Sequence, residues 1–238
     1  MRAIQKKRVT LHRLSRERDG QSGCSAVGSA LRSGRRGRAF ESPHPDFQKS
    51  KVAFKSRGNA SAFLFKNRME RKMEILLRKW TTEDRASLMA LCNAVDRAFL
   101  ADRLPHPYAE EDAEVWLEFV QRHEGTDGVF RAIVVDGEVV GSISVERKQD
   151  VHRIDGEIGF MLLTSHWNQG IMTKAVQQIC PAALKELALN RITASVFEPN
   201  IASQHVLLNN GFRHEGTMAR AAIKNGTIYD IRIYGWLP

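Results

Sequence analysis

The segment that most constrains the fold is VFRAIVVDGEVVGSISVERK, residues 129–148. Its two halves have the composition of β-strands, and Asp136-Gly137 stands between them. An Asp-Gly pair between two such stretches is a strong signal for a two-residue hairpin turn. The chain is therefore expected to contain a sheet in which two consecutive strands lie side by side and run antiparallel.

A second hairpin is expected near the C-terminus, because Asn225-Gly226 precedes the strand that contains YDIRIYGWL. Other segments also have strand composition, and they are EILLRKW (74–80), RIDGEIGFMLL (153–163) and RITASVF (191–197).

Helices are predicted between these strands. The 81–95 helix opens on Thr-x-x-Asp, which resembles a capping box. The 106–123 helix has an acidic first turn, which suits the positive end of a helix dipole. A short helix is expected over 201–210. The predicted apolar stripes are Leu88, Leu91 and Val95 in the first helix and Val115, Trp116 and Phe119 in the second.

A longer helix is predicted over 173–189, although it contains Pro181. Proline cannot donate to the carbonyl of Gln177 and costs ~3 kcal/mol inside a helix. We nevertheless expect one bent helix, because apolar residues keep helical spacing across the proline at Ala175, Val176, Ile179, Ala183 and Leu187. The complete order of elements predicts an α/β fold with a mixed, mostly antiparallel twisted sheet flanked by helices.

The charge is divided unevenly along the 238 residues. Residues 1–72 hold 19 Lys and Arg against 5 Asp and Glu, whereas residues 73–238 hold the remaining 17 basic and 22 acidic residues. The first 72 residues have no persistent helical or strand period and are rich in Ser, Gly and Arg, so they are expected to be a disordered basic extension. A basic RNA-binding tail is the functional alternative. The acidic remainder, 73–238, is expected to be the single folded domain.

Another hypothesis for residues 1–72 is that they do not belong to the natural protein. The stretch GCSAVGSALRSGRRGRAFESPHPDF resembles a transfer-RNA gene translated in frame. The T-loop sequence TTCGAGTCC would encode Phe40-Glu41-Ser42, and a D-arm sequence would encode most of SAVGSA. The working protein would then begin near Met69 or Met73.

The segment HWNQGIMTKAVQQI, residues 166–179, passes from a polar loop into a helix. A helix N-terminus offers unpaired N–H groups and partial positive charge, which suit a phosphate. Gly170 permits a tight turn and a close backbone approach. Neither the Gly-x-x-x-x-Gly-Lys nor the Gly-x-Gly-x-x-Gly fingerprint is present, so an ordinary strand-to-helix turn is the alternative.

Three blocks in this order resemble the GNAT superfamily of N-acetyltransferases, in particular the branch that acetylates the N-termini of ribosomal proteins. The blocks are EIGFMLLTSHWNQGIMTKAV, NRITASVFEPNIASQHVLLNNGFRHEG and KNGTIYDIRIYGWL. The resemblance extends over essentially all of residues 74–238 and implies acetyl-CoA as the donor.

The resemblance also implies how acetyl-CoA would be held. Its pyrophosphate would lie on the backbone N–H groups of the loop and first helical turn, and its pantetheine arm beside the preceding strand and next to Asn200. Met172 and Asn168 stand where small residues or Gly are frequent in the family, and neither removes a backbone donor. The implied cofactor-binding residues are Met161, Leu162, Leu163, Gln169, Gly170, Ile171, Met172, Thr173 and Asn200.

Direct transfer to an amine requires a neutral amine, a stabilised oxyanion and a proton for the leaving thiolate. A backbone N–H of the 153–163 strand is available for the oxyanion. Ser203 is the predicted general acid, with a helix cap as its alternative role. Glu157 is the predicted general base, with an exposed, solvated carboxylate as the alternative.

The remaining chemically active residues suggest no second mechanism. Tyr108 and Tyr229 are either acceptor-pocket or packing residues, and Cys180 is expected to be buried and not nucleophilic. His166 and His205 belong to no ligand cluster, so no metal site is expected. The three cysteines are too few and scattered for a disulfide framework.

The sequence therefore predicts a cytoplasmic acetyl-CoA-dependent N-acetyltransferase that modifies a primary amine, most simply the N-terminus of a ribosomal protein. A small-molecule amine acetyltransferase and a non-catalytic acyl-CoA-binding regulator are the alternatives. No membrane or nucleic-acid partner is expected, and the protein is expected to be a monomer or a homodimer.

Overall fold

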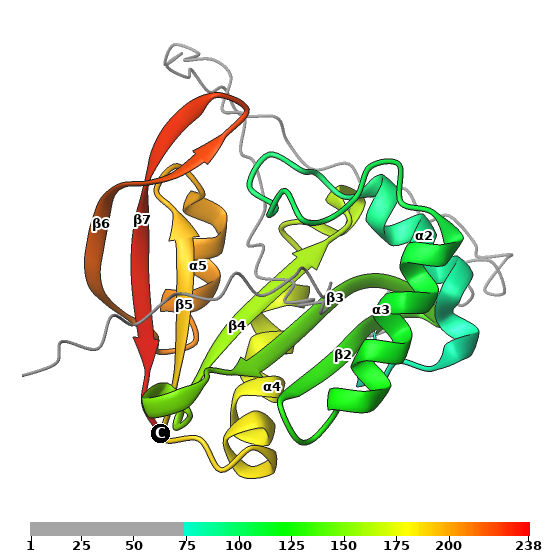
Figure 1. Cartoon of the computed structure of the whole chain (residues 1–238), viewed down its shortest axis with the longest axis horizontal. Helices are drawn as coiled ribbons and strands as arrows, with labels where there is room; N and C mark the ends of the chain where they lie inside the picture. The colour runs from blue at the N-terminus through cyan, green and yellow to red at the C-terminus, as the bar shows by residue number, and fades with distance from the viewer. Residues whose placement is uncertain (1–73) are drawn as a thin grey trace, which may run out of the picture.

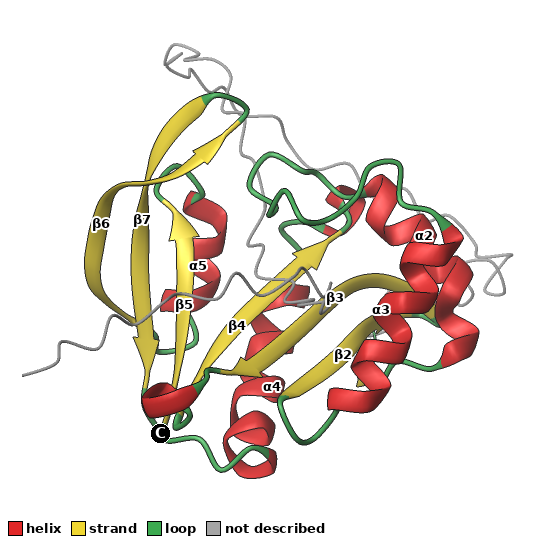
Figure 2. Ribbon diagram, in the orientation of Figure 1, coloured by secondary structure: helices red, strands yellow, loops and turns green. Residues whose placement is uncertain are grey.

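The computed structural model describes residues 74–238, so the expected extension over 1–72 and its exact boundary lie outside the described residues. A curved sheet forms the centre of the molecule, with helices on both faces (Figures 1 and 2). Its strands are β1 (Ile75–Arg78), β2 (Gly128–Val135), β3 (Glu138–Arg147), β4 (Asp155–Leu162), β5 (Arg191–Phe197), β6 (Arg213–Lys224) and β7 (Thr227–Trp236). The helices are α2 (Arg85–Ala94), α3 (Glu110–His123), α4 (Ile171–Glu186) and α5 (Ile201–Leu208).

The seven strands are arranged in the order β1-β2-β3-β4-β5-β7-β6. Every neighbouring pair is antiparallel except β4 and β5, which are parallel. The predicted α/β class, the order of elements and the mostly antiparallel sheet are therefore confirmed.

Both predicted hairpins form. Asp136 and Gly137 have φ values of 49° and 92°, and Asn225 and Gly226 have φ values of 50° and 77°. Two successive positive φ values define the type I′ turn, whose twist matches that of antiparallel strands. The two dipeptides therefore fix which strands are neighbours at both places.

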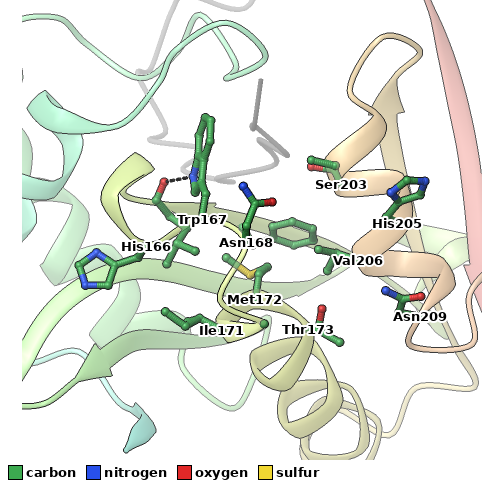
Figure 3. Close-up of a pocket in the computed structure, with 14 residues that line it drawn as sticks. His166, Trp167, Asn168, Ile171, Met172, Thr173, Ser203, His205, Val206 and Asn209 are labelled. Carbon is green, nitrogen blue, oxygen red and sulfur yellow. Dashed lines mark hydrogen bonds between the residues drawn. The ribbon is translucent and has the colours of Figure 1, made fainter. Parts of the chain in front are cut away.

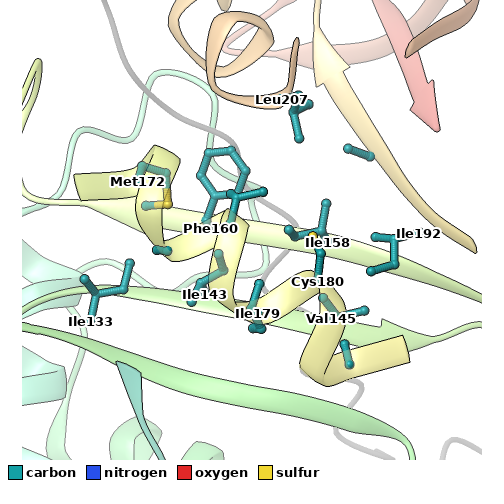
Figure 4. Packing of buried hydrophobic residues seen from close by; sticks show 14 of the residues in the cluster. Ile133, Ile143, Val145, Ile158, Phe160, Met172, Ile179, Cys180, Ile192 and Leu207 are labelled. Atoms are coloured by element: carbon teal, nitrogen blue, oxygen red, sulfur yellow. The ribbon is translucent and has the colours of Figure 1, made fainter. Parts of the chain in front are cut away.

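Apolar side chains fill the space on both faces of the sheet. One cluster lies between the sheet and α4, and Figure 4 shows Ile143, Ile158 and Ile179 within it. The other cluster lies against α2 and α3, where the rings of Trp80 and Trp116 meet edge to face at 5.3 Å. Each fully buried Ile or Leu contributes ~1.5–3 kcal/mol, so these clusters dominate the stability of the fold.

The predicted apolar stripe of the second helix was wrong at Val115, which is 64% exposed. The buried face of α3 consists instead of Ala113, Trp116, Leu117 and Val120. These residues follow the i, i+3, i+4, i+7 spacing of one helix face, and Val115 lies outside it.

Helix α4 begins two residues before the predicted position and ends three residues earlier. It is continuous through Pro181, as predicted, because the neighbouring Ile179, Cys180 and Ala183 remain buried against the sheet. The bend at the proline stays a prediction. At its C-terminus, the Arg147 guanidinium donates to the carbonyl of Leu187 at 2.6 Å, which occupies one of the carbonyls that helix ends leave unpaired.

Candidate active site

The parallel strands β4 and β5 pair over only three residues. The last of these pairs is Glu157 with Thr193, after which β5 continues beside β7. The short ladder is reinforced on one face, where the Thr193 hydroxyl donates to the carboxylate of Asp155 at 3.2 Å. Among residues 74–238, no strand pairs with the β5 side of β4 beyond this point.

The edge of β4 that faces β5 retains backbone groups suited to a ligand. The N–H of Leu163 donates to Val140 on β3 at 2.9 Å, so the alternation of the strand turns the N–H groups of Phe160 and Leu162 toward β5. The indole N–H of Trp167 donates to the carbonyl of Leu162 at 3.0 Å, the dashed line in Figure 3. This bond ties the loop after β4 to the strand end.

A cavity of about 260 Å³ opens where β4 and β5 separate. The end of β4, the following loop and the first turn of α4 form one side, and α5 forms the other (Figure 3). Its lining residues are Phe160, Leu162, His166, Trp167, Asn168, Gly170, Ile171, Met172, Thr173, Ala202, Ser203, His205, Val206 and Asn209.

The first turn of α4 presents uncapped N–H groups beside this cavity. Gly170 is the N-cap residue, with φ of 72° and no side-chain cap hydrogen bond. The first intrahelical bond runs from the N–H of Lys174 to the carbonyl of Gly170 at 3.1 Å, so the N–H groups of Ile171, Met172 and Thr173 precede the helical ladder. A Cβ at Gly170 would meet no atom within 4 Å, so the space beside its backbone is open. These features suit an anion such as a phosphate.

The two unusual residues of the loop are compatible with this arrangement. Asn168 has φ of 61°, a conformation that Asn tolerates better than most residues with a side chain. Met172 is 7% exposed and packs within the apolar cluster under α4, so its side chain leaves the backbone N–H groups of the first turn uncovered.

The N-terminus of α5 is closed by its own side chain. Asn200 is fully buried, and its side-chain oxygen accepts a hydrogen bond from the N–H of Ser203 at 3.3 Å. The alternative role of Ser203 as the cap is therefore wrong, because Asn200 caps the helix. Ser203 is 1% exposed and contributes to the cavity wall.

Glu157 lies on the opposite face of the sheet from the cavity. Alternation along β4 places it on the same face as Met161, which belongs to the cluster under α2 and α3, and on the other face from Phe160. It is partly buried at the last residue pair of the β4–β5 ladder. An acceptor that enters from this face would therefore meet Glu157 where the two strands part.

Six of the predicted site residues come together around the cavity: Leu162, Gly170, Ile171, Met172, Thr173 and Ser203. The others do not line it. Met161 belongs to the cluster on the other face, Leu163 packs against both clusters, and the side-chain amide of Gln169 donates to the carbonyl of Ser165 at 3.0 Å.

Sequence reasoning missed the α5 residues of the cavity wall other than Ser203. Ala202, Val206 and Asn209 follow the i, i+4, i+7 spacing of one helix face. That spacing was visible in the sequence, but it did not indicate whether this helix face points toward the cavity, because that depends on how α5 packs on the rest of the molecule.

Other reactive groups lie elsewhere. Burial raises the pKa of the Cys180 thiol to about 12, so this residue is a packing residue, as expected. Tyr108 is also buried. Within residues 74–238, no three His, Cys, Asp or Glu side chains are grouped as metal ligands, and no helix is long and apolar enough to cross a bilayer.

Comparison with known proteins defines the class. Residues 74–213 match the Acetyltransferase (GNAT) domain family, and the chain belongs to this family of acetyltransferases. It is 34% identical to an uncharacterized N-acetyltransferase, YoaA of Bacillus subtilis, over 41% of this chain and 54% of YoaA. It is 29% identical to the ribosomal-protein-serine acetyltransferase of Escherichia coli over 50% of this chain and 74% of the relative. The chain thus spans about half the length of the first of these relatives.

The fold is also similar to that of solved acetyltransferases. The microcin C7 self-immunity acetyltransferase MccE, solved in complex with acetyl-CoA and AMP, has a TM-score of 0.61 and 21% identity. The match covers 69% of this chain and 93% of MccE.

Proposed function

We propose that the chain is an acetyl-CoA-dependent N-acetyltransferase that modifies the N-terminal amine of a protein, and that residues 73–238 are its catalytic unit. The observation that carries the proposal is the uncapped first turn of α4, which adjoins the cavity where β4 and β5 separate. The ribosomal-protein-serine acetyltransferase among its relatives favours a protein acceptor, and a cytoplasmic location follows from that substrate.

Acetyl-CoA would supply a thioester whose acyl carbon is attacked by the amine. The backbone N–H groups of the loop and first turn would bind its pyrophosphate, assisted by the positive end of the α4 dipole, and they belong to Gln169, Gly170, Ile171, Met172 and Thr173. The β5-facing N–H groups of β4 would hydrogen-bond the pantetheine arm as a neighbouring strand would. Asn200 remains proposed as a ligand of that arm in addition to its capping role.

Two side chains are proposed for the proton transfers. Ser203 lies in the α5 wall of the cavity and would give a proton to the departing thiolate. Glu157, on the opposite face at the end of the ladder, would take the proton of the incoming amine, directly or through water. A backbone N–H of β4 would stabilise the oxyanion that develops between them.

A small amine is the second proposed acceptor, supported by the L-amino acid N-acetyltransferase AaaT of Escherichia coli, to which this chain is 25% identical over 66% of its length. The discriminating experiment is a thiol-release assay of the full chain and of residues 73–238 with acetyl-CoA. The acceptors are basic peptides with free N-termini, the same peptides with blocked N-termini, and a panel of polyamines and amino acids.

We expect turnover on free peptide N-termini and none on the blocked peptides. Turnover on small amines alone would overturn the choice of acceptor. Binding of acetyl-CoA without turnover on any acceptor would indicate the non-catalytic regulator instead.

A further inference from the structure

The sheet consists of two parts with a short connection between them. β1 to β4 form one part and β5 to β7 the other, and three residue pairs of β4 and β5 join them. The two cavity walls belong mainly to different parts, since α4 packs chiefly on β1 to β3 and the Tyr234 hydroxyl of β7 donates to Gln204 of α5 at 3.1 Å, although α4 also contacts β5 and α5 directly. The distance between the two cavity walls therefore depends on the position of β5 to β7 relative to β1 to β4.

The loop between α2 and α3, residues 95–109, contacts both parts of the sheet. Leu100 is 1% exposed within the cluster under α2 and α3. The preceding residue, Phe99, packs on the other part, with ring centroids 5.7 Å from Phe197 and 6.4 Å from Tyr229. Phe197 and Tyr229 are themselves 5.7 Å apart, so the three rings form one cluster.

An ion pair makes a second contact between this loop and the far part of the sheet. The Lys224 ammonium, whose side chain is 9% exposed, donates to the carboxylate of Asp102, which is 74% exposed. A nearly buried ammonium is costly unless it is paired, so Lys224 favours the position of the loop that supplies its partner.

The loop is also braced internally. Asn93 exchanges two hydrogen bonds of 2.9 Å with the backbone of Tyr108, and the Arg97 guanidinium donates to the carbonyl of Leu104. The side chain of Asp96 accepts from the N–H of Ala98 at 2.8 Å. Because these hydrogen bonds make the loop rigid, a displacement at one end of the loop also moves the other end. A flexible loop would change its own conformation instead.

The loop contacts the sheet at the end where β4 and β5 are separated. Phe197 is the last residue of β5, and Figure 1 shows the loop between α2 and α3 crossing toward the ends of β4 and β5. The ladder thus joins the two parts of the sheet at one end and the loop joins them at the other, while α4 contacts β5 and α5 between these ends.

We propose that the 95–109 loop is a clasp that sets the separation of β4 and β5, and that Phe99 and the Asp102–Lys224 pair are positioning residues for the donor cavity. None of these three residues lines the cavity, so they act through the placement of α5 relative to α4. The cavity is then held at its working width before any ligand binds.

Hydrogen exchange of the ligand-free full chain tests the clasp directly. In Phe99→Ala and in Asp102→Ala, we expect the amides of residues 158–163 and 200–209 to exchange about 3- to 30-fold faster than in the wild type. Phe119→Ala is the matched control, because Phe119 is a partly buried ring on α3 that contacts Phe130 and His123 instead. Unchanged exchange at both cavity walls in the two clasp variants would overturn the proposal.

The affinity for coenzyme A, measured by calorimetry, gives a second readout that rests on the proposed function. Both clasp variants should bind coenzyme A about 3- to 30-fold more weakly, Phe99→Tyr should restore wild-type affinity, and Phe119→Ala should leave it unchanged. Wild-type affinity in both clasp variants would refute a positioning role. If the wild type does not bind coenzyme A, the proposed function fails, and the exchange result still decides whether the clasp exists.

Discussion

Two helix N-termini adjoin the same cavity and differ in how their N–H groups are used. At α4, the cap residue is Gly170 and no side-chain cap hydrogen bond forms. At α5, the side chain of Asn200 accepts from the N–H of Ser203. A helix N-terminus can satisfy its own donors and gain stability, or leave them available for a ligand.

The closed N-terminus of α5 suggests that the two helices have different chemical roles. Asn200 holds the backbone N–H of Ser203, and this places the nearly buried serine in the cavity wall. α4 would bind the donor and α5 would hold the group that acts on it. Variants at these two N-termini and at a third one test this division, from the largest expected effect to the smallest.

Replacement of the proposed acid should have the largest effect. In Ser203→Ala, we expect turnover to fall by ~10²–10⁴-fold, because general acid catalysis contributes that much. Coenzyme A affinity should change by less than about 3-fold, since the loss lies in proton transfer. Steady-state kinetics and calorimetry measure the two quantities. Ser165→Ala, an exposed serine in the loop before α4, is the control, and a loss of only a few-fold in Ser203→Ala would leave Ser203 a packing residue.

A side chain at the open N-terminus should weaken donor binding. In Gly170→Val, coenzyme A should bind about 10- to 100-fold more weakly, because the loss of hydrogen bonds to a charged group costs ~1.5–3 kcal/mol. The positive φ also strains a β-branched residue, so the urea midpoint should fall. Calorimetry below the unfolding transition separates the two effects. Wild-type affinity in a folded variant would remove this loop from the binding site.

A third helix N-terminus, also closed, is that of the 3-10 turn Thr82–Asp84 that leads into α2, and none of its residues lines the cavity. The Asp84 carboxylate accepts from the N–H of Thr81 at 2.9 Å and from both terminal nitrogens of Arg78 at 2.6 Å. We expect Asp84→Asn to lower the free energy of unfolding by about 1–2 kcal/mol at pH 7, less than a fully buried charged bond because Arg78 is one-third exposed. Coenzyme A affinity should not change.

The same carboxylate makes a pH-dependent contribution. The hydrogen bond from Arg78 holds the pKa of Asp84 below its ordinary value. Its stabilisation is therefore complete above the unfolded pKa of about 3.9 and is lost as the pH falls through the lower folded pKa. Urea denaturation should show a constant difference between wild type and Asp84→Asn from pH 7 to about 5, narrowing below about 4. A difference in stability that widens as the pH falls would contradict a lowered pKa of Asp84 in the folded state.

Opening the N-terminus of α5 should have the smallest effect. Asn200→Ala should cost ~1 kcal/mol of stability, the typical value of a lost N-cap. Asn200→Asp, which retains a capping oxygen, is the matched control. An unchanged free energy of unfolding in Asn200→Ala would show that Asn200 does not cap α5, and the contrast between the two helices would fail. A lower coenzyme A affinity beside the loss of stability would match its second proposed role, as a ligand of the pantetheine arm.

The sequence predicted the parts of the fold that depend on neighbouring residues. Asp136-Gly137 and Asn225-Gly226 fixed two hairpins because a two-residue turn permits only one pairing of its strands. Val115 was misplaced because the composition of α3 allowed more than one apolar face, and only packing on Trp80 and Phe130 selected between them.

The site was less predictable, because it depends on residues far apart in the chain. The loop around Gly170 could be found from its glycine and the helix that follows. The contact between Asp102 and Lys224 joins residues 122 positions apart, and nothing local to either residue indicates the other. The closing of α5 by Asn200 was visible as an Asn-x-x-Ser pattern, but Ser203 was an equally good cap until the structure separated their roles.

The buried thiol of Cys180 has a practical consequence for the enzymology. Burial raises the pKa of this thiol to about 12, so it is almost entirely protonated at pH 8, and only the thiolate reacts with disulfide reagents. A reagent added to count the thiols released from the donor would leave Cys180 unmodified while the helix remains packed on the sheet. In a variant in which Cys24 and Cys92 are replaced by Ser, slow labelling in the absence of substrate would then report how often the structure around Cys180 opens.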